Sequence, residues 1–175
     1  ILFGFATDTY DILGKIINSK NVFSAEKISK VVNKNLKYFL GERIQRYPKY
    51  SSKTVQGKPL FFYARAGLDV NLPTRKIVIQ KLEFNGLRSV NPKRLLQNIE
   101  KRIKKVRGDF RQKEIIEKWR ETLQGKKESM YLGDFSVNCG SGTYVRGIAN
   151  SLGRKINIPC LAFSIKRIKI GKFVI

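Results

Sequence analysis

The sequence predicts an α+β fold, in which a mixed, mostly antiparallel sheet is flanked by helices. Segments rich in β-branched and aromatic residues lie towards both ends of the chain, and segments of helical periodicity interrupt them. Strands grouped in this way favour antiparallel pairing around one core. The 175 residues are enough for a single domain with a buried interior.

The first elements are a strand–turn–strand unit and a helix. Apolar residues at 1–5 and 15–17 enclose a polar turn at 7–11, a pattern that predicts two strands joined by that turn. Ser24 then begins a segment in which apolar residues recur at helical spacing until Gly41. We expect this segment to be a helix.

The centre of the chain is less regular. Residues 43–52 are too rich in turn-forming and aromatic residues for a helix. A short helix is predicted over 60–66, and Gly67 should end it. Residues 75–84 are rich in β-branched side chains that alternate in part with polar ones, which predicts a strand.

A basic helical hairpin is predicted within residues 88–128. Asn91-Pro92 is typical of a helix start, and an apolar stripe follows it as far as Val106. A second helix is predicted over 111–124, with Gly125 at its end. Because Lys and Arg crowd the outer faces, the default interpretation of the hairpin is a solvated cover for the domain.

The last part of the chain should hold a strand over 130–139, a helix over 143–155 and a strand over 162–174. Glycines between the first two allow a tight turn, and Thr143 is suited to cap the helix. We expect Arg146 to project from the first helical turn towards the end of the sheet. Its guanidinium can hold a carboxylate or a phosphate through two hydrogen bonds. An ordinary glycine loop with a surface Arg is the alternative.

The charge of the chain predicts a polyanionic partner. Lys and Arg number 36 against 13 Asp and Glu, which gives a formal net charge of +23. Nucleic acid is the first candidate and an anionic membrane surface the second. A Lys-rich genome is the alternative, although acidic residues would then ordinarily rise as well. If the partner is RNA, we expect phosphate contacts from the hairpin residues Lys101, Arg102, Lys104 and Lys105.

The absence of histidine excludes Ser-His-Asp hydrolysis, Cys-His proteolysis and most zinc chemistry. Catalysis would have to use carboxylates, Arg, Lys, Tyr or backbone groups. Cys139 and Cys160 lie far apart and are typical of reduced thiols in the cytoplasm, and we expect Cys139 to lie in the core. No apolar run approaches the ~20 residues of a membrane span, and no signal peptide is visible.

Two further features have a functional and a structural interpretation. Aromatic side chains interleave with Arg and Lys at 45–51 and 63–67, which suits RNA because bases stack on aromatic rings and phosphates need cations. A packed turn beside a proline is the alternative. Asp8 and Asp11 could serve acid–base catalysis as a carboxylate pair. Such side chains also simply close turns by accepting hydrogen bonds from nearby amides.

Four segments taken together narrow the function. In chain order they are LFG with TDTYDILG (2–14), GERIQRYPKYSS to YARAG (41–67), CGSGTYVRGIA with LG (139–153), and IKRIKIGKF (165–173). Their order and spacing resemble the motifs of the TruB family of tRNA pseudouridine synthases, which is related to dyskerin. The resemblance spans almost the whole chain.

The resemblance implies the pseudouridine synthase catalytic fold and an isomerase activity. The T-loop uridine of tRNA (position 55) would be flipped into a pocket and attacked by an aspartate, after which its base would detach, rotate and rejoin through carbon 5. No metal and no cofactor would be required. The expected partner is the T-arm of tRNA, and the expected protein is a cytoplasmic monomer.

The resemblance also assigns two catalytic residues. Arg146 matches the Arg that pairs with the nucleophilic aspartate and keeps it charged in a desolvated site. Tyr144 matches the Tyr of the GTY motif, which lies near the pocket.

Four further residues would bind the substrate. Asp11 matches a carboxylate close to the target base, and Ile165 matches an aliphatic side chain that packs against the flipped base. Arg65 matches an Arg that contacts RNA, and Tyr50 lies in the matching YS segment.

The sequence departs from the family's motifs in several places. Tyr47, Thr54 and Ser141 stand where the family has a proline and two lysines. The family's compact form lacks the hairpin, so residues 88–128 are expected to be an insertion within the catalytic domain.

The GTLDP segment that carries the family's nucleophilic aspartate would lie before residue 1. Residues 1–175 are therefore expected to be part of a catalytic domain, and to be inactive on their own. Arg146 would then face an empty site.

Three other functions stay open. The same fold could serve as a non-catalytic RNA-binding or RNA-chaperone domain, or the chain could be a basic ribosome-associated protein without a pocket. A glycosidase with two carboxylates is the least favoured, because a second well-placed acidic loop is missing.

Overall fold

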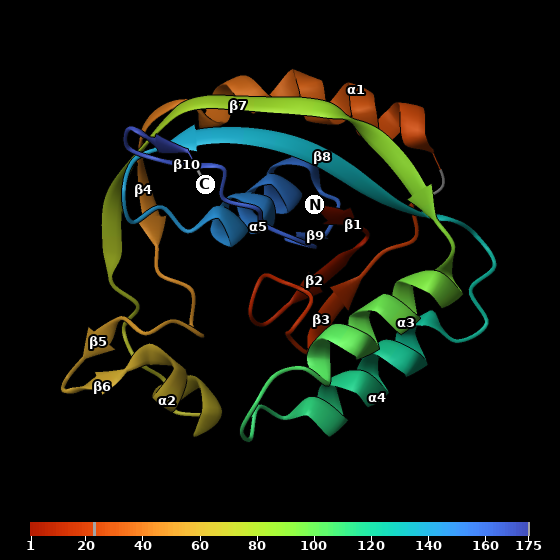
Figure 1. Cartoon of the computed structure of the whole chain (residues 1–175), viewed down its shortest axis with the longest axis horizontal. Helices are drawn as coiled ribbons and strands as arrows, with labels where there is room; N and C mark the ends of the chain where they lie inside the picture. Colours follow the sequence, from red (N-terminus) through yellow and green to blue (C-terminus); the bar gives the residue numbers. More distant parts are fainter. Residues whose placement is uncertain (23, 175) are drawn as a thin grey trace.

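The computed structural model describes residues 1–22 and 24–174. A curled five-stranded sheet forms its centre, with neighbouring strands antiparallel throughout (Figure 1). In sheet order the strands are β4 (Gly41–Arg46), β7 (Thr74–Val90), β8 (Met130–Cys139), β1 (Leu2–Phe3) and β9 (Cys160–Leu161). The helices pack around this sheet, so the α+β prediction is confirmed.

Two helices pack together on one face of the sheet. They are α1 (Ala25–Leu36), which a short 3₁₀ turn, η1 (Lys37–Phe39), extends, and α5 (Val145–Ile156). Ser24 caps α1 as expected, because its side chain accepts a hydrogen bond from the amide of Lys27. One buried cluster joins both helices to the sheet: Phe3, Ile28, Val32, Leu152, Ile156 and Cys160.

The strand–turn–strand unit at the start of the chain is confirmed. β2 (Phe5–Thr7) pairs antiparallel with β3 (Ile16–Ser19), and the register shifts between Ala6 and Thr7. Residues 8–15 form the turn between these strands, and Asp11 bridges to Ala162 just after β9. The turn is thereby fixed against the edge of the main sheet.

The hairpin is confirmed as α3 (Pro92–Ile103) and α4 (Gln112–Leu123). Asn91 caps α3 by accepting hydrogen bonds from the amides of Lys93 and Arg94. The apolar stripes of both helices are buried in the same cluster as β1, β2 and β3: Leu2, Phe5, Ile16, Leu95, Ile99, Ile103, Ile115, Trp119 and Leu123. The hairpin therefore belongs to the main core and is more than a cover.

A small arm lies opposite the hairpin (Figure 1). It consists of β5 (Thr54–Val55), β6 (Lys58–Pro59) and α2 (Leu60–Arg65), which matches the short helix predicted over 60–66. No helix in the described ranges has the length and apolar character needed to cross a membrane.

Three strand predictions need correction. Strand β4 was missed because its sequence, GERIQR, is charged and mostly exposed, and its pairing with β7 defines it as a strand. β7 continues to Val90, six residues past the predicted end at 84. The pair Asn85-Gly86 is typical of a turn, but here it does not end the strand. Gly86, with a φ of +130°, instead lies at a bulge in the β7–β8 ladder.

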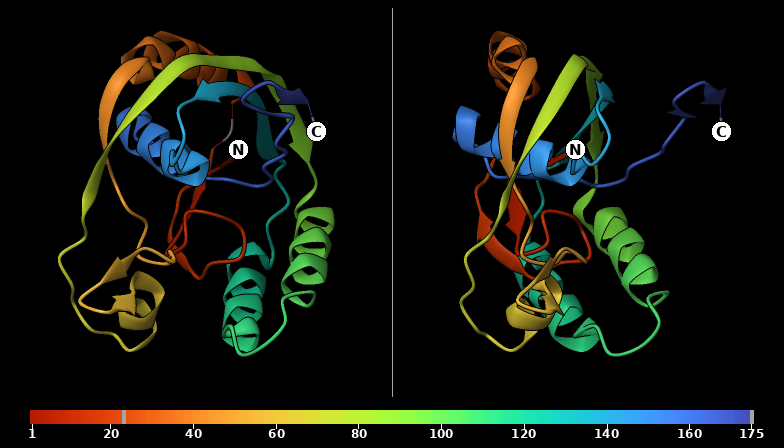
Figure 2. Two further views of the ribbon diagram at one scale, coloured as in Figure 1. Left: turned by 60° about the vertical axis from the view of Figure 1, so that its left-hand side comes forward. Right: turned by 90° about the vertical axis from the view of Figure 1, so that its left-hand side faces the viewer.

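The predicted strand over 162–174 is wrong. A tight turn at Gly171, which has a φ of +57°, folds this segment into β10 (Lys169–Ile170) and β11 (Phe173–Val174). This two-stranded unit projects away from the body of the molecule (Figure 2, right). Its alternating apolar residues give a strand-like sequence, yet Ile170, Phe173 and Val174 are exposed.

Candidate active site

The polar turn after β2 holds Asp11 in a fixed orientation. The Thr9 hydroxyl donates to Asp11 Oδ1 over 2.7 Å, and the Leu13 amide donates to the same oxygen over 3.0 Å. The Thr7 hydroxyl donates to the Asp11 carbonyl over 2.6 Å. Both threonines are buried. These bonds close the turn, as the structural interpretation expected, and leave Asp11 Oδ2 for another partner.

That partner is Arg146. Its Nη1 lies 2.8 Å from Asp11 Oδ2, and its Nη2 donates to the carbonyl oxygen of Tyr50. Arg146 lies in the first turn of α5, so the ion pair joins the start of this helix to the turn after β2. The side chains of Arg146 and Asp11 are 20% and 21% exposed, and partial desolvation strengthens such a charge-assisted hydrogen bond. The Arg146 guanidinium therefore already has two partners within residues 1–22 and 24–174.

The loop before α5 is held by a residue that the sequence analysis did not single out. Gln45 of β4 donates from Nε2 to the Tyr144 carbonyl over 3.0 Å and accepts from the Tyr144 amide over 2.9 Å. A side chain at Gly147 would collide with Gln45, since a Cβ there would lie 2.9 Å from Nε2. The position of Gln45 in the segment 41–67 that matches the family's motif was the available signal.

The prediction that Thr143 caps α5 is wrong. Tyr144 is the residue at the N-cap, and no side chain caps the helix there. Thr143 instead donates from Oγ1 to the carbonyl of Gly140 over 2.7 Å, which closes the glycine turn. Gly142 has a φ of +78°, and a Cβ on it would lie 2.1 Å from Nη1 of Arg75. Glycine at this position therefore lets a cationic side chain pack directly on the loop.

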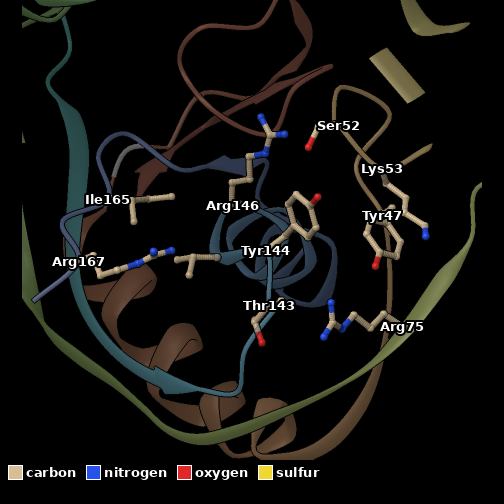
Figure 3. Close-up of a pocket in the computed structure, with 11 residues that line it drawn as sticks. Tyr47, Ser52, Lys53, Arg75, Thr143, Tyr144, Arg146, Ile165 and Arg167 are labelled. Atoms are coloured by element: carbon tan, nitrogen blue, oxygen red, sulfur yellow. The ribbon is translucent and has the colours of Figure 1, made fainter. Parts of the chain in front are cut away.

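A cavity of 480 Å³ opens in front of this loop (Figure 3). Tyr144 and Arg146 line it from α5, and Ile165 lines it on the side away from Tyr47. The rings of Tyr47 and Tyr144 meet edge to face, with 5.5 Å between centroids. Three further cations line the cavity: Lys53, Arg75 and Arg167. The cavity combines aromatic and aliphatic surface with positive charge, as a nucleotide requires.

A second cavity, of 220 Å³, shares Arg146 and Ser52 with the first. Asp11, Tyr50 and Arg65 line it. The six candidate residues therefore all line one of two cavities that meet at Arg146. They come from four separated segments of the chain, which the fold brings together.

The second cavity has aromatic side chains from two different parts of the fold, the small arm and the α3–α4 hairpin. The Arg65 guanidinium lies 5.5 Å from the ring of Phe61 in α2 and 5.7 Å from the ring of Phe110 in the loop between α3 and α4. Phe61 and Phe110 both line the cavity. The sequence analysis did not connect Phe110 with the site, because the apolar periodicity of the hairpin gives no information on where its loop points.

Tyr50 is held by the hairpin as well. The guanidinium of Arg111 lies 4.6 Å from the centre of the Tyr50 ring, within cation–π distance. Desolvation by burial, followed by the nearby Asp8 carboxylate, raises the pKa of Tyr50 above its usual value. Tyr50 is therefore a neutral phenol at physiological pH, available for packing and hydrogen bonding.

The two cysteines lie outside the site. Both are free thiols: Cys160 is buried, and Cys139 is half-buried and packs against a core cluster, as its place in a strand predicted. Burial raises the pKa of the Cys160 thiol, which makes it a poor nucleophile. Within residues 1–22 and 24–174, no group of three or more His, Cys, Asp or Glu side chains is placed to hold a metal ion.

Comparison with known proteins places this site in a family. The family model for "TruB family pseudouridylate synthase (N terminal domain)" matches residues 1–110, and the match ends in the loop between α3 and α4. "tRNA pseudouridine synthase B" of Ligilactobacillus salivarius is 33% identical over 178 residues, which cover 100% of this chain and 46% of that protein.

Two further relatives bear the same name. The protein of Synechocystis is 31% identical over 156 residues, covering 89% of this chain and 39% of the relative. That of Caldanaerobacter subterraneus subsp. tengcongensis is 30% identical over 175 residues, which cover 99% of this chain and 46% of that protein. The chain thus spans less than half the length of these curated relatives. Because the family model matches more than half of the 175 residues, the chain belongs to the TruB family of pseudouridylate synthases.

Proposed function

We propose that the protein is a tRNA pseudouridine synthase that isomerises the T-loop uridine. The observation that carries this proposal is the convergence of Asp11, Arg146 and Tyr144 on two adjoining cavities in a chain of this family. The relatives named above are tRNA pseudouridine synthases, which supports tRNA as the substrate.

In the proposed mechanism the target uridine leaves the T-loop stack and enters the cavity. An aspartate then attacks C1′ of the ribose as the bond from C1′ to N1 of the base breaks, and the detached base rotates. Carbon 5 bonds to C1′ while the bond to the aspartate breaks, and carbon 5 loses its proton as N1 gains one. We place the nucleophilic aspartate outside residues 1–175. Arg146 would hold that carboxylate charged and oriented, while Asp11 and the Tyr50 carbonyl keep the guanidinium in place.

The other predicted residues fit roles around the flipped base. Tyr144 lines the cavity from the start of α5, and Ile165 supplies an aliphatic surface on which a base can pack. Arg65 lines the second cavity between two aromatic rings, where it would contact RNA. The net charge of +23 supports a polyanionic partner such as the T-arm of tRNA.

The remaining parts of the proposal concern organisation. We propose that residues 1–175 form part of one catalytic domain and that residues 88–128 are an insertion in it. The protein would act as a monomer without a cofactor, and its free thiols suit the cytoplasm. A non-catalytic RNA-binding domain of the same fold is the second candidate. The pairing of Arg146 with Asp11 favours it, because this ion pair satisfies the guanidinium without a nucleophile.

The test uses the full-length gene product and a T-arm stem–loop RNA, followed by chemical mapping of pseudouridine. We expect one modified position, the T-loop uridine, and no product with RNA in which that uridine is replaced by cytidine. Tight binding without product would favour the RNA-binding domain. Neither binding nor product would refute both candidates.

A further inference from the structure

The α3–α4 hairpin is attached to the turn that carries Asp11 at three places. Arg111 Nη1 lies 2.9 Å from Asp8 Oδ2, and Trp119 Nε1 donates to the Gly14 carbonyl over 3.2 Å. Lys15 and Glu114 form an ion pair. Each contact joins α4, or the residue just before it, to a residue between 8 and 15. The hairpin therefore holds the turn at both of its ends.

Arg111 is the contact nearest to the site. It lies at the N-cap of α4 and has left-handed backbone geometry, with φ of +60°, which is unfavourable for a residue other than glycine. Its Nε and Nη2 atoms are buried and have no hydrogen-bond partner within the described part of the chain. Buried donors without a hydrogen-bond partner destabilise a fold. Both features oppose stability, whereas the ion pair with Asp8 and the contact with the Tyr50 ring favour it.

The loop that presents Arg111 is itself well held. Gln112 donates from Nε2 to the carbonyls of Val106 and Gly108, and its Oε1 accepts from the amide of Phe110. These bonds fix the loop between α3 and α4, so Arg111 and Phe110 are presented in defined positions. Phe110 lines the second cavity beside Asp11 and Arg146.

The contacts of Arg111 lead to Arg146 along two short routes. Arg111 binds Asp8, which lies three positions before Asp11 in the same turn, and Asp11 binds Arg146 Nη1. Arg111 also lies over the ring of Tyr50, whose carbonyl accepts from Arg146 Nη2. Arg111 therefore contacts both chain segments that supply the partners of the Arg146 guanidinium.

We propose that Arg111 is a positioning residue and that the α3–α4 hairpin is a functional part of the catalytic site. By fixing Asp8 and Tyr50 it sets the orientation of Arg146 without touching the substrate. This inference rests on the proposed function, because it assigns Arg146 to the chemistry. It predicts that loss of Arg111 lowers turnover, since a small displacement of a catalytic group is costly to the rate.

The experiment compares Arg111→Gln and Arg111→Lys with the unsubstituted full-length protein. Arg107→Gln is the matched control, because Arg107 is an exposed residue of the same loop and its loss removes the same charge. We expect Arg111→Gln to lower kcat about tenfold or more, with KM for the T-arm RNA changed less than about twofold. Arg111→Lys should recover part of this loss, because it keeps a charge near Asp8 but lacks a flat group to stack on Tyr50. Arg107→Gln should leave kcat unchanged.

The outcomes separate the positioning role from the alternatives. A rise in KM at unchanged kcat would make Arg111 an RNA-binding residue and overturn the proposal, as would unchanged kcat in both variants. If Arg111→Gln does not fold, Arg111→Lys alone decides. A lowered kcat with unchanged KM supports the proposal, and a kcat equal to that of the unsubstituted protein contradicts it.

A second readout needs no activity. In the RNA-free protein, amide hydrogen exchange of residues 7–14 should be faster in Arg111→Gln than in Arg107→Gln. If the unsubstituted protein makes no pseudouridine, the proposed function fails, and this measurement still decides whether Arg111 fixes the turn. Equal exchange in the two variants would refute the positioning role.

Discussion

Arg146 and Asp11 lie 135 positions apart in the sequence and form an ion pair, with 2.8 Å between Nη1 and Oδ2. One residue belongs to the first turn of α5 and the other to the turn between β2 and β3. The Tyr50 carbonyl, from a third segment, binds the same guanidinium. Arg146, which lines both cavities, thus has partners that only the folded chain brings together.

The first prediction concerns Arg146 itself. In the full-length protein, Arg146→Ala should lower kcat by about 100-fold or more and leave the Kd for tRNA nearly unchanged, because the guanidinium serves a carboxylate and not a phosphate. Arg146→Lys should also fail, since an ammonium cannot bind Asp11 and the Tyr50 carbonyl with the planar geometry of a guanidinium. Single-turnover kinetics and a filter-binding assay give the two quantities. A Kd that rises in proportion to the loss of kcat would make Arg146 a binding residue.

The second prediction concerns Gln45, which holds the backbone of Tyr144 through two hydrogen bonds. Gln45→Ala should destabilise the protein by about 1–3 kcal/mol and lower turnover, because Tyr144 and the start of α5 lose their support. Gln45→Glu keeps the acceptor for the Tyr144 amide but loses the donor to its carbonyl. Its stability and turnover should therefore lie between those of the unsubstituted protein and of Gln45→Ala. Urea unfolding and turnover are measured together, with the exposed Gln97→Ala as the control. Full activity in Gln45→Ala would contradict the role given to Gln45.

The third prediction tests whether the hairpin belongs to the core. Trp119 is fully buried, its ring lies 5.5 Å from that of Phe5, and its indole nitrogen bonds to the Gly14 carbonyl. Trp119→Ala should therefore lower the free energy of unfolding by about 3–5 kcal/mol. Glu117→Ala, on the exposed face of the same helix, should change it little. A small effect of Trp119→Ala in urea unfolding would mean that the hairpin is a separable attachment.

Local sequence patterns predicted most of the elements because their causes are local. The cap at Ser24, the Asn91-Pro92 start of α3 and the β-branched run at the start of β7 each depend on neighbouring residues, and the structure confirms them. The edge strand β4 depends on a partner more than 25 residues away, so its charged sequence gave no signal. The error at residues 169–174 was the reverse: their apolar alternation predicted a strand of the main sheet, whereas these residues form a separate, exposed unit.

The site residues were found through motif resemblance, and their partners were not. The composition and the motifs led to Asp11 and Arg146 separately, but their ion pair depends on the tertiary fold. Arg111 and Gln45 were not predicted for the same reason: Arg111 contacts Tyr50 about 60 positions away, and Gln45 contacts Tyr144 about 100 positions away. A basic residue in a basic hairpin carries no mark that distinguishes a positioning role from a solvated one.

The fourth prediction concerns the salt dependence of RNA binding. Six phosphate contacts would give a log–log slope of about −4 to −5 against salt concentration. Replacing Lys101, Lys104 and Lys105 with Gln should reduce the steepness by about 2 to 3. Arg102, which the sequence grouped with them, is excluded because its Nη1 donates to the Phe163 carbonyl over 2.6 Å.

The matched control replaces the same number of charges on α1, a helix that lies across the molecule from the hairpin (Figure 1): Lys27, Lys30 and Lys34. This variant should keep the original slope. Equal slopes in the two triple variants would show that the hairpin makes no special contribution to RNA binding.

The last prediction is that residues 1–175 on their own form no pseudouridine. Asp11 lines the second cavity and Asp8 lies three positions before it in the same turn, and both oxygens of each are already bonded. Asp8 accepts from the Lys15 amide through Oδ1 and pairs with Arg111 through Oδ2. Asp11 accepts from Thr9 and Leu13 through Oδ1 and pairs with Arg146 through Oδ2. Attack on a nucleotide would require either side chain to leave the bonds that close its own turn, and a nucleophile must be held to within about half an ångström. The purified 175-residue protein is incubated with T-arm RNA, and pseudouridine is mapped chemically. Stoichiometric product that disappears in Asp11→Asn, but persists in Glu42→Gln as an exposed acidic control, would make Asp11 the nucleophile and move the active site to this turn.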